Sequence, residues 1–208
     1  MIRPKTGKSI AGFFSFIFHP LLMATFAAVI FFNSGHFFAV VNYELRTSVF
    51  LIFFILTCLT PALFVPAINF FRLSSNKEIS DKNIRLITLF MISVLYAVVY
   101  YYMKRIMIPD VLLNIILSSI LIMLAGGIIS IFWNISLYTC AIGGLAGYVF
   151  FLAYAAGLTA VLFYFLIIVI VVGIVATSRL YLNKHNPLQV YTGIALGFFI
   201  SYFTLLVF

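Results

Sequence analysis

The sequence predicts an all-α polytopic integral membrane protein, a helical bundle with six or seven transmembrane helices. Composition is the first observation behind this prediction. Of the 208 residues, 65% are apolar and only 8% are charged, whereas soluble domains carry about 25% charged residues. The mean hydropathy of +1.26 agrees with this. Because so few charged side chains cannot cover a water-facing surface, most of the chain must face lipid or other protein. This composition excludes soluble receptor domains, disulfide scaffolds and nucleic-acid-binding proteins.

The second observation is a series of apolar runs, each near the roughly 20 residues that a membrane-spanning helix needs. They lie at about 12–32, 48–71, 86–103, 111–132, 139–157, 159–177 and 187–208. The runs are continuous rather than alternating, which predicts helices, because an open strand edge cannot face lipid. No repeat or low-complexity linker divides the chain. We therefore predict a single transmembrane domain over residues 1–208.

Three local patterns refine this reading. The first run contains His19-Pro20, and a proline kinks or splits a span, so the count stays at six or seven. Gly157 marks a tight turn between the fifth and sixth runs. The last run begins with Asn186-Pro187, and Gln189 follows. These residues predict an N-cap, a proline at the first helical position and a capping box.

Small and polar residues are unevenly distributed. Gly143, Gly144 and Gly147 are expected to permit close helix approach. If all seven runs cross, the loops after the second, fourth and sixth runs share one face of the bundle. We call it the motif face; its polar residues lie within 72–85, 133–138 and 178–189. The opposite face receives fewer polar residues, which are His36, Glu44, Arg46, Lys104, Arg105 and Asp110. Chemistry is therefore expected at the motif face, provided that its three loops converge.

The third loop carries a resemblance to a known family. Ser178-Arg179, five residues, His185, three residues and Gln189 resembles the third signature of the type 2 phosphatidic acid phosphatase family. The segment from Trp133 to Tyr138, followed by Ala141-Ile142-Gly143-Gly144, lies where that family has Pro-Ser-Gly-His. Lys82-Asn83-Ile84-Arg85 stands in for the first signature. Bacterial membrane relatives with a Phe-His-Pro-Leu-Leu opening, like residues 18–22, look most similar.

The resemblance implies both an activity and a location. A metal-independent phosphoric monoester or diphosphate hydrolase would act on a phospholipid or polyprenyl phosphate head group in the inner (plasma) membrane of a bacterium. Its partners would be membrane lipids, not nucleic acid, and neither a cofactor nor a metal is implied. The implied catalytic residues are His185 as the nucleophile, Gln189 in place of the orienting Asp and Tyr138 in place of the proton-donating His. The implied substrate-binding residues are Arg179, Ser136, Arg85 and Lys82.

The residues themselves favour phosphate binding over turnover. The guanidinium fork of Arg179 suits phosphate oxygens, and His185 precedes a helix N-terminus, where an anion is favoured. The groups at the proton-transfer positions are weaker. The phenol of Tyr138 is a poor acid, since the ordinary pKa of tyrosine is about 10. The amide of Gln189 can orient an imidazole but cannot stabilise an imidazolium.

Plainer interpretations stay open. Arg179 could snorkel at the end of a span, Gln189 could serve only the capping box, and Lys82 could belong to a solvated loop. His19 and His36 are expected to be structural or exposed. The alternative function is a non-catalytic membrane scaffold or a transporter-like protein on the same bundle. The sequence leaves open the lipid, the oligomeric state and the side of the membrane on which the motif face lies.

Overall fold

A computed structural model describes residues 5–34, 43–64, 66, 80–155, 157 and 159–208, and within these ranges the chain is helical with no strand. The long elements are α1 (Lys5–Ile17), α2 (Pro20–Asn33), α3 (Tyr43–Phe54), α5 (Asp81–Arg105), α6 (Asp110–Phe132), α7 (Leu137–Phe150), α8 (Leu162–Tyr181) and α9 (Pro187–Val207). Two π-helical stretches, η2 (Ile55–Leu59) and η3 (Phe151–Ala155), follow α3 and α7, and a short 3₁₀ turn, η4 (Thr159–Val161), precedes α8.

Six helical segments are long and apolar enough to cross a membrane, which confirms the predicted fold class. They are Arg46–Phe64, Lys82–Arg105, Asp110–Phe132, Leu137–Ala155, Leu162–Tyr181 and Pro187–Val207. The predicted run at 48–71 agrees with the first of these as far as Phe64; residues 65 and 67–71 lie outside the described part. The protein is therefore a polytopic helical membrane protein.

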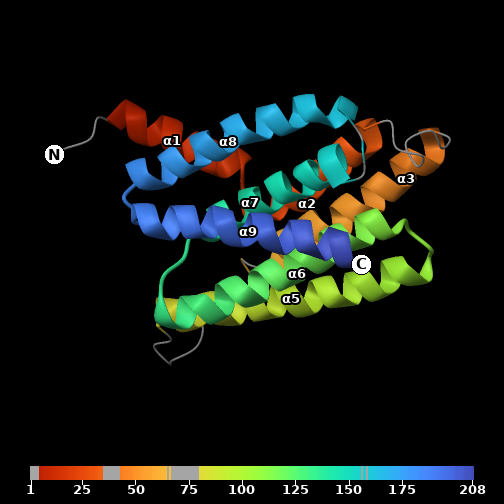
Figure 1. The fold of residues 1–208 in the computed structure, drawn as a ribbon. Coiled ribbons are helices and arrows are strands. Elements are labelled where there is room, and N and C mark those ends of the chain that lie inside the picture. The colour runs from red at the N-terminus through yellow and green to blue at the C-terminus, as the bar shows by residue number, and fades with distance from the viewer. Residues whose placement is uncertain (1–4, 35–42, 65, 67–79, 156, 158) are drawn as a thin grey trace.

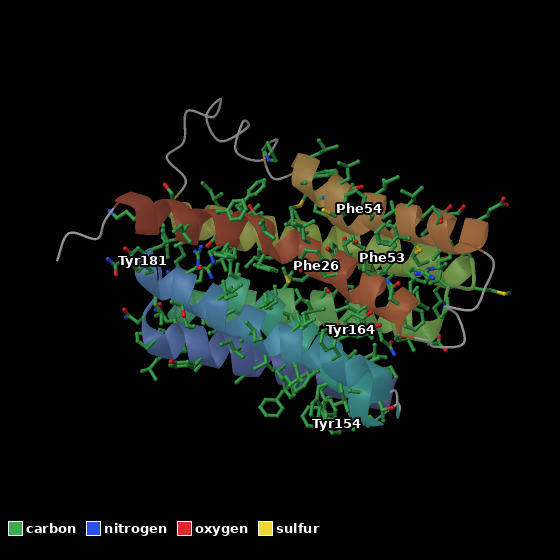
Figure 2. All side chains as sticks on the ribbon, turned by 90° about the horizontal axis from the view of Figure 1, so that it is seen from above. Phe26, Phe53, Phe54, Tyr154, Tyr164 and Tyr181 are labelled. Atoms are coloured by element: carbon green, nitrogen blue, oxygen red, sulfur yellow. The ribbon has the colours of Figure 1, made fainter. Side chains whose placement is uncertain are left out.

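A bent pair of helices supplies the seventh candidate pass. The segments Gly7–Ile17 and Pro20–Asn33 meet at an angle of 57°, at the His19-Pro20 step that the sequence marks as a break. Figure 1 shows α1 beginning at the same end of the bundle as the α8–α9 connection, with α2 continuing toward the opposite end. In Figure 2, Tyr181, at the end of α8, lies close to the start of α1. The pair thus runs the length of the bundle, as a broken span would.

Helix α7 lies at the centre of the bundle (Figure 1). It contacts α2, α6, α8 and α9, and 67% of its span is buried, against 22–33% for the other spans. Glycines make its contact with α9 possible, because a Cβ at Gly143 or Gly147 would collide with the backbone of α9 at Ile194 or Phe198. The close approach predicted for these glycines is confirmed. In return, a Cβ on Gly197 of α9 would collide with the Cys140 carbonyl.

Two of the predicted helix boundaries are also confirmed. Gly157 has a φ of +69°, a left-handed conformation that glycine adopts without strain, between η3 and η4. At the start of α9, the Asn186 N–H donates to Oε1 of Gln189 at 3.0 Å, which closes the expected capping box, and Pro187 is the first helical residue. This cap fixes the direction in which the third loop enters the last helix.

Candidate functional site

The second loop, residues 133–136, is where the three loops of the motif face meet. Arg85, in the first turns of α5, donates from one guanidinium nitrogen to Oδ1 of Asn134 and from the other to the Ile135 carbonyl at 2.5 Å. His185, between α8 and α9, places Nδ1 3.2 Å from the Asn134 carbonyl oxygen. These contacts join residues about fifty positions apart in sequence, so the convergence that the site requires is present.

Aromatic contacts bring in a third and a fourth cationic or imidazole side chain. Tyr138 lies in the first turn of α7, and the guanidinium carbon of Arg179 lies 4.1 Å from the centre of its ring. A cation over a tyrosine face at this distance is attracted by the ring quadrupole. The imidazole of His19 packs against the same ring edge-on, with the ring centres 5.5 Å apart. Tyr138 therefore ties the start of α7 both to the end of α8 and to the break between α1 and α2.

The charge of this cluster is not compensated within the described part of the chain. There, neither Arg85 nor Arg179 forms an ion pair, and Nε of each is buried without a hydrogen-bond partner. Removing cations from water without a counter-charge costs free energy, and a bound anion would offset that cost. Two half-buried guanidinium groups with spare N–H donors thus form a site that favours an anion.

The environment of His185 favours its neutral form. Partial burial is the largest cause of the lowering of its pKa, and the charges of Arg179 and Arg85 lower it further. Hydrogen bonds to the Asn134 carbonyl and the Gln189 side chain act in the opposite direction but do not cancel this. Because a carbonyl oxygen only accepts, the bond to Asn134 requires the proton of the neutral ring to be on Nδ1. Nε2 then carries the lone pair that a nucleophile needs.

The remaining predicted residues have other contacts. The backbone carbonyl of Gln189 accepts the N–H of Ser136 at 3.3 Å, while its side chain serves the capping box and His185. Ser136 is fully buried and its hydroxyl has no partner in the described part of the chain. Lys82 donates to the Ile131 carbonyl at 2.6 Å, near the last turn of α6. The structure therefore gives Gln189 and Lys82 roles in joining loops and helix ends.

A cavity of about 310 Å³ lies beside the cluster, between α2, α5, α6 and α7. Its wall is mainly apolar and includes Ala24, Leu89, Ile92, Ile115, Met123 and Leu145. Ser118 and Ser119 also line it, but both hydroxyls already donate to the Ile115 carbonyl. Arg85, Tyr138 and His19 are also among the lining residues. Arg85 and Tyr138 thus belong both to the cationic cluster and to the cavity, which makes the combined site amphipathic.

Sequence reasoning missed two members of this site. Asn134 offers its side chain to Arg85 and its carbonyl to His185, a role that the residue type alone does not indicate. His19 was expected to be structural or exposed; it does cap α2, and it also lines the cavity. Its position at the proline break of an apolar run is the signal that could have singled it out, since breaks in spans commonly adjoin cavities. His36 lies outside the described residues.

Comparison of this chain with protein-family models, with curated proteins and with solved structures gives no match.

Proposed function

We propose that this protein binds the phosphate head group of a membrane lipid at the motif face, as a divergent relative of the type 2 phosphatidic acid phosphatases in a bacterial inner membrane. One observation carries the proposal: three loops bring Arg85, Arg179 and His185 together beside an apolar cavity, and no described carboxylate pairs with them. A ligand suited to such a site has a negative head and a hydrocarbon tail.

The proposed binding mode follows from where the cations lie. Arg179 and His185 contact the head group from the third loop, and Arg85 contacts it from α5. Guanidinium groups bind phosphate oxygens through paired N–H donors, which adds geometric specificity to the charge attraction. The tail enters the cavity between α2, α5, α6 and α7. At about 310 Å³ the cavity lies at the lower end of the range for small-molecule sites, roughly 300–1,000 Å³, so it takes part of a lipid chain.

Hydrolysis is the second part of the proposal. Nε2 of His185 attacks phosphorus, a P–N bond forms, and the P–O bond to the lipid breaks. The departing oxygen takes a proton from the Tyr138 hydroxyl. Water then attacks the phospho-histidine, the P–N bond breaks, and the proton of that water returns to Tyr138. The Asn134 carbonyl holds the imidazole but carries no full negative charge, so we expect slow turnover compared with a site in which a carboxylate holds it.

Binding is tested with purified protein and a short-chain phosphatidic acid, using the fluorescence of Trp133, the single tryptophan, beside Asn134. Arg179→Ala should weaken binding about thirtyfold, since removing one partner of a close charge contact costs about 2 kcal/mol. The matched control is Arg46→Ala in α3. It also removes an arginine beside an aromatic ring, since the Arg46 guanidinium carbon lies 5.7 Å from the centre of the Phe32 ring. Equal affinity of the two variants would refute the binding proposal.

The hydrolytic part is tested by phosphate release from phosphatidic acid and from a polyprenyl pyrophosphate. Wild type should release phosphate and form an acid-labile phosphoryl adduct, and His185→Ala should do neither while still binding the lipid. If wild type binds lipid phosphate and releases none, the protein is a binding protein on this fold. If Arg179→Ala also leaves binding unchanged, the scaffold alternative holds.

A further inference from the structure

His19 lies at the break between α1 and α2, and both of its ring nitrogens can be assigned. Nδ1 accepts the backbone N–H of Leu21 at 3.4 Å, so the side chain caps the N-terminus of α2, with Pro20 in the first turn. A nitrogen that accepts a hydrogen bond carries no proton. The proton of the neutral ring is therefore on Nε2, which makes Nε2–H a hydrogen-bond donor.

That donor has no protein acceptor among the described residues, although the ring is in contact with the site. His19 is half-buried, lines the cavity and packs edge-on against Tyr138. Arg85 lines the same cavity. Arg179 and His185 belong to the cationic cluster but are not part of the cavity lining. Because His19 and Arg85 line the cavity and Arg179 and His185 do not, the first two are placed where a head group would join a tail held in the cavity.

We propose that His19 is a specificity-determining ligand of the bound lipid, donating Nε2–H to the bridging oxygen between phosphorus and the lipid chain, or to the oxygen next to it. This inference rests on the proposed function and identifies the part of the ligand that is recognised at the cavity. Inorganic phosphate has no chain and is held by the two arginines and His185, without His19. His19 therefore lets the site bind a lipid phosphate in preference to free phosphate.

Two substitutions separate this role from helix capping. Asparagine places a side-chain oxygen near the position of Nδ1 and is among the best N-cap residues, so His19→Asn keeps the bond to Leu21 and loses the Nε2–H donor. Glutamine is a poor N-cap, but its amide N–H reaches about as far as Nε2. His19→Gln therefore keeps the donor and loses the cap. Pro20 is unchanged in both variants.

The experiment measures the dissociation constants of dioctanoyl phosphatidic acid and of inorganic phosphate by Trp133 fluorescence, together with thermal midpoints in detergent. His19→Asn should bind the lipid about tenfold more weakly, the equivalent of one lost hydrogen bond, with inorganic phosphate binding and the thermal midpoint unchanged. His19→Gln should retain most of the lipid affinity and melt at a lower temperature. A purely structural histidine predicts the reverse order of lipid affinities.

The outcomes distinguish this inference from the proposal beneath it. If His19→Asn binds the lipid as wild type does while Arg179→Ala does not, His19 is only a cap and the proposed function stands. If His19→Asn weakens lipid and inorganic phosphate equally, the specificity claim is wrong. If Arg179→Ala leaves both ligands unaffected, the proposed function itself fails.

Discussion

The two ends of the bundle hold their cations in different ways. At the end opposite the motif face, Arg105 donates to the hydroxyl of Tyr101 at 2.5 Å, one turn earlier in the same helix, and Lys104 lies 6.0 Å from the Tyr100 ring. Arg46 donates to Asn33 of α2, only 13 residues away in sequence. All these contacts are local. At the motif face, Arg85 and His185 reach the second loop from about fifty residues away.

This difference distinguishes anchoring from site formation. Cations beside aromatic rings at the end of a span serve the membrane interface, where a long side chain keeps its charge in water. Cations drawn from separate elements onto one loop lose part of their hydration, and in the described part of the chain no carboxylate replaces it. The same residue types thus have different surroundings at the two ends, and the second arrangement is the one that we propose binds an anionic ligand.

The largest effect is expected from disturbing the α7–α9 contact, which positions Tyr138 and the third loop. Gly197→Ala places a Cβ against the Cys140 carbonyl. Because that neighbour is backbone and cannot swing away, we expect a loss of about 3 kcal/mol in stability and a release of the motif face. Gly173→Ala in α8 is the control, since its Cβ would meet nothing within 4 Å. Thermal unfolding in detergent measures the stability of both variants, and equal midpoints would contradict a close α7–α9 contact at Gly197.

The next largest effect is expected when an arginine is removed at the motif face rather than at the opposite end of the bundle. Arg85→Ala removes a charged donor and two bonds to the second loop, while Arg105→Ala removes a local contact at the opposite end. We expect Arg85→Ala to weaken lipid-phosphate binding about thirtyfold, on the order of 2 kcal/mol, and Arg105→Ala to leave it within about twofold, since exposed charges contribute little. A similar loss in both variants would mean that net charge alone, rather than the assembled site, attracts the lipid.

The smallest effect is a shift in titration. Because partial burial and the charges of Arg179 and Arg85 lower the pKa of His185, its imidazole should become protonated only below its ordinary value of 6.5. The neutral, nucleophilic form therefore persists as the pH falls through 6.5. Arg179→Gln removes one of the charges, so it should raise the pKa toward that value. Nitrogen NMR of labelled histidine, assigned with His185→Gln, measures the His185 pKa in wild type and in Arg179→Gln. A wild-type titration midpoint above 6.5 would contradict the prediction.

Several features followed from local sequence. The spans could be located because hydrophobicity over about 20 residues is itself the requirement for crossing a bilayer. The capping box at Asn186 and Gln189 and the bend at Pro20 depend on neighbouring residues only. The glycines of α7 were identifiable as contact residues because a helix can approach closely only where side chains are absent.

Other features depended on packing. The carbonyl that holds His185 belongs to Asn134, and any residue type at that position would supply one. Whether His19 faced lipid or the cavity depended on how the α1–α2 pair lay against α7. The contact between Arg179 and Tyr138 depended on the register between α7 and α8. None of these contacts can be predicted from a short stretch of sequence, because each joins residues that are far apart along the chain.

By itself, the sequence determined that this protein is a polytopic helical bundle, where its last helix begins and its first span breaks, and which residues with useful chemistry it carries. The tertiary structure decided which of them meet. Arg85, Arg179, His185 and His19 share one region because α7, through its glycines, packs closely on α9 and holds the second loop against the third. Hydropathy is a property of each segment, whereas a site is a property of distances between segments, and only the packed bundle fixes those.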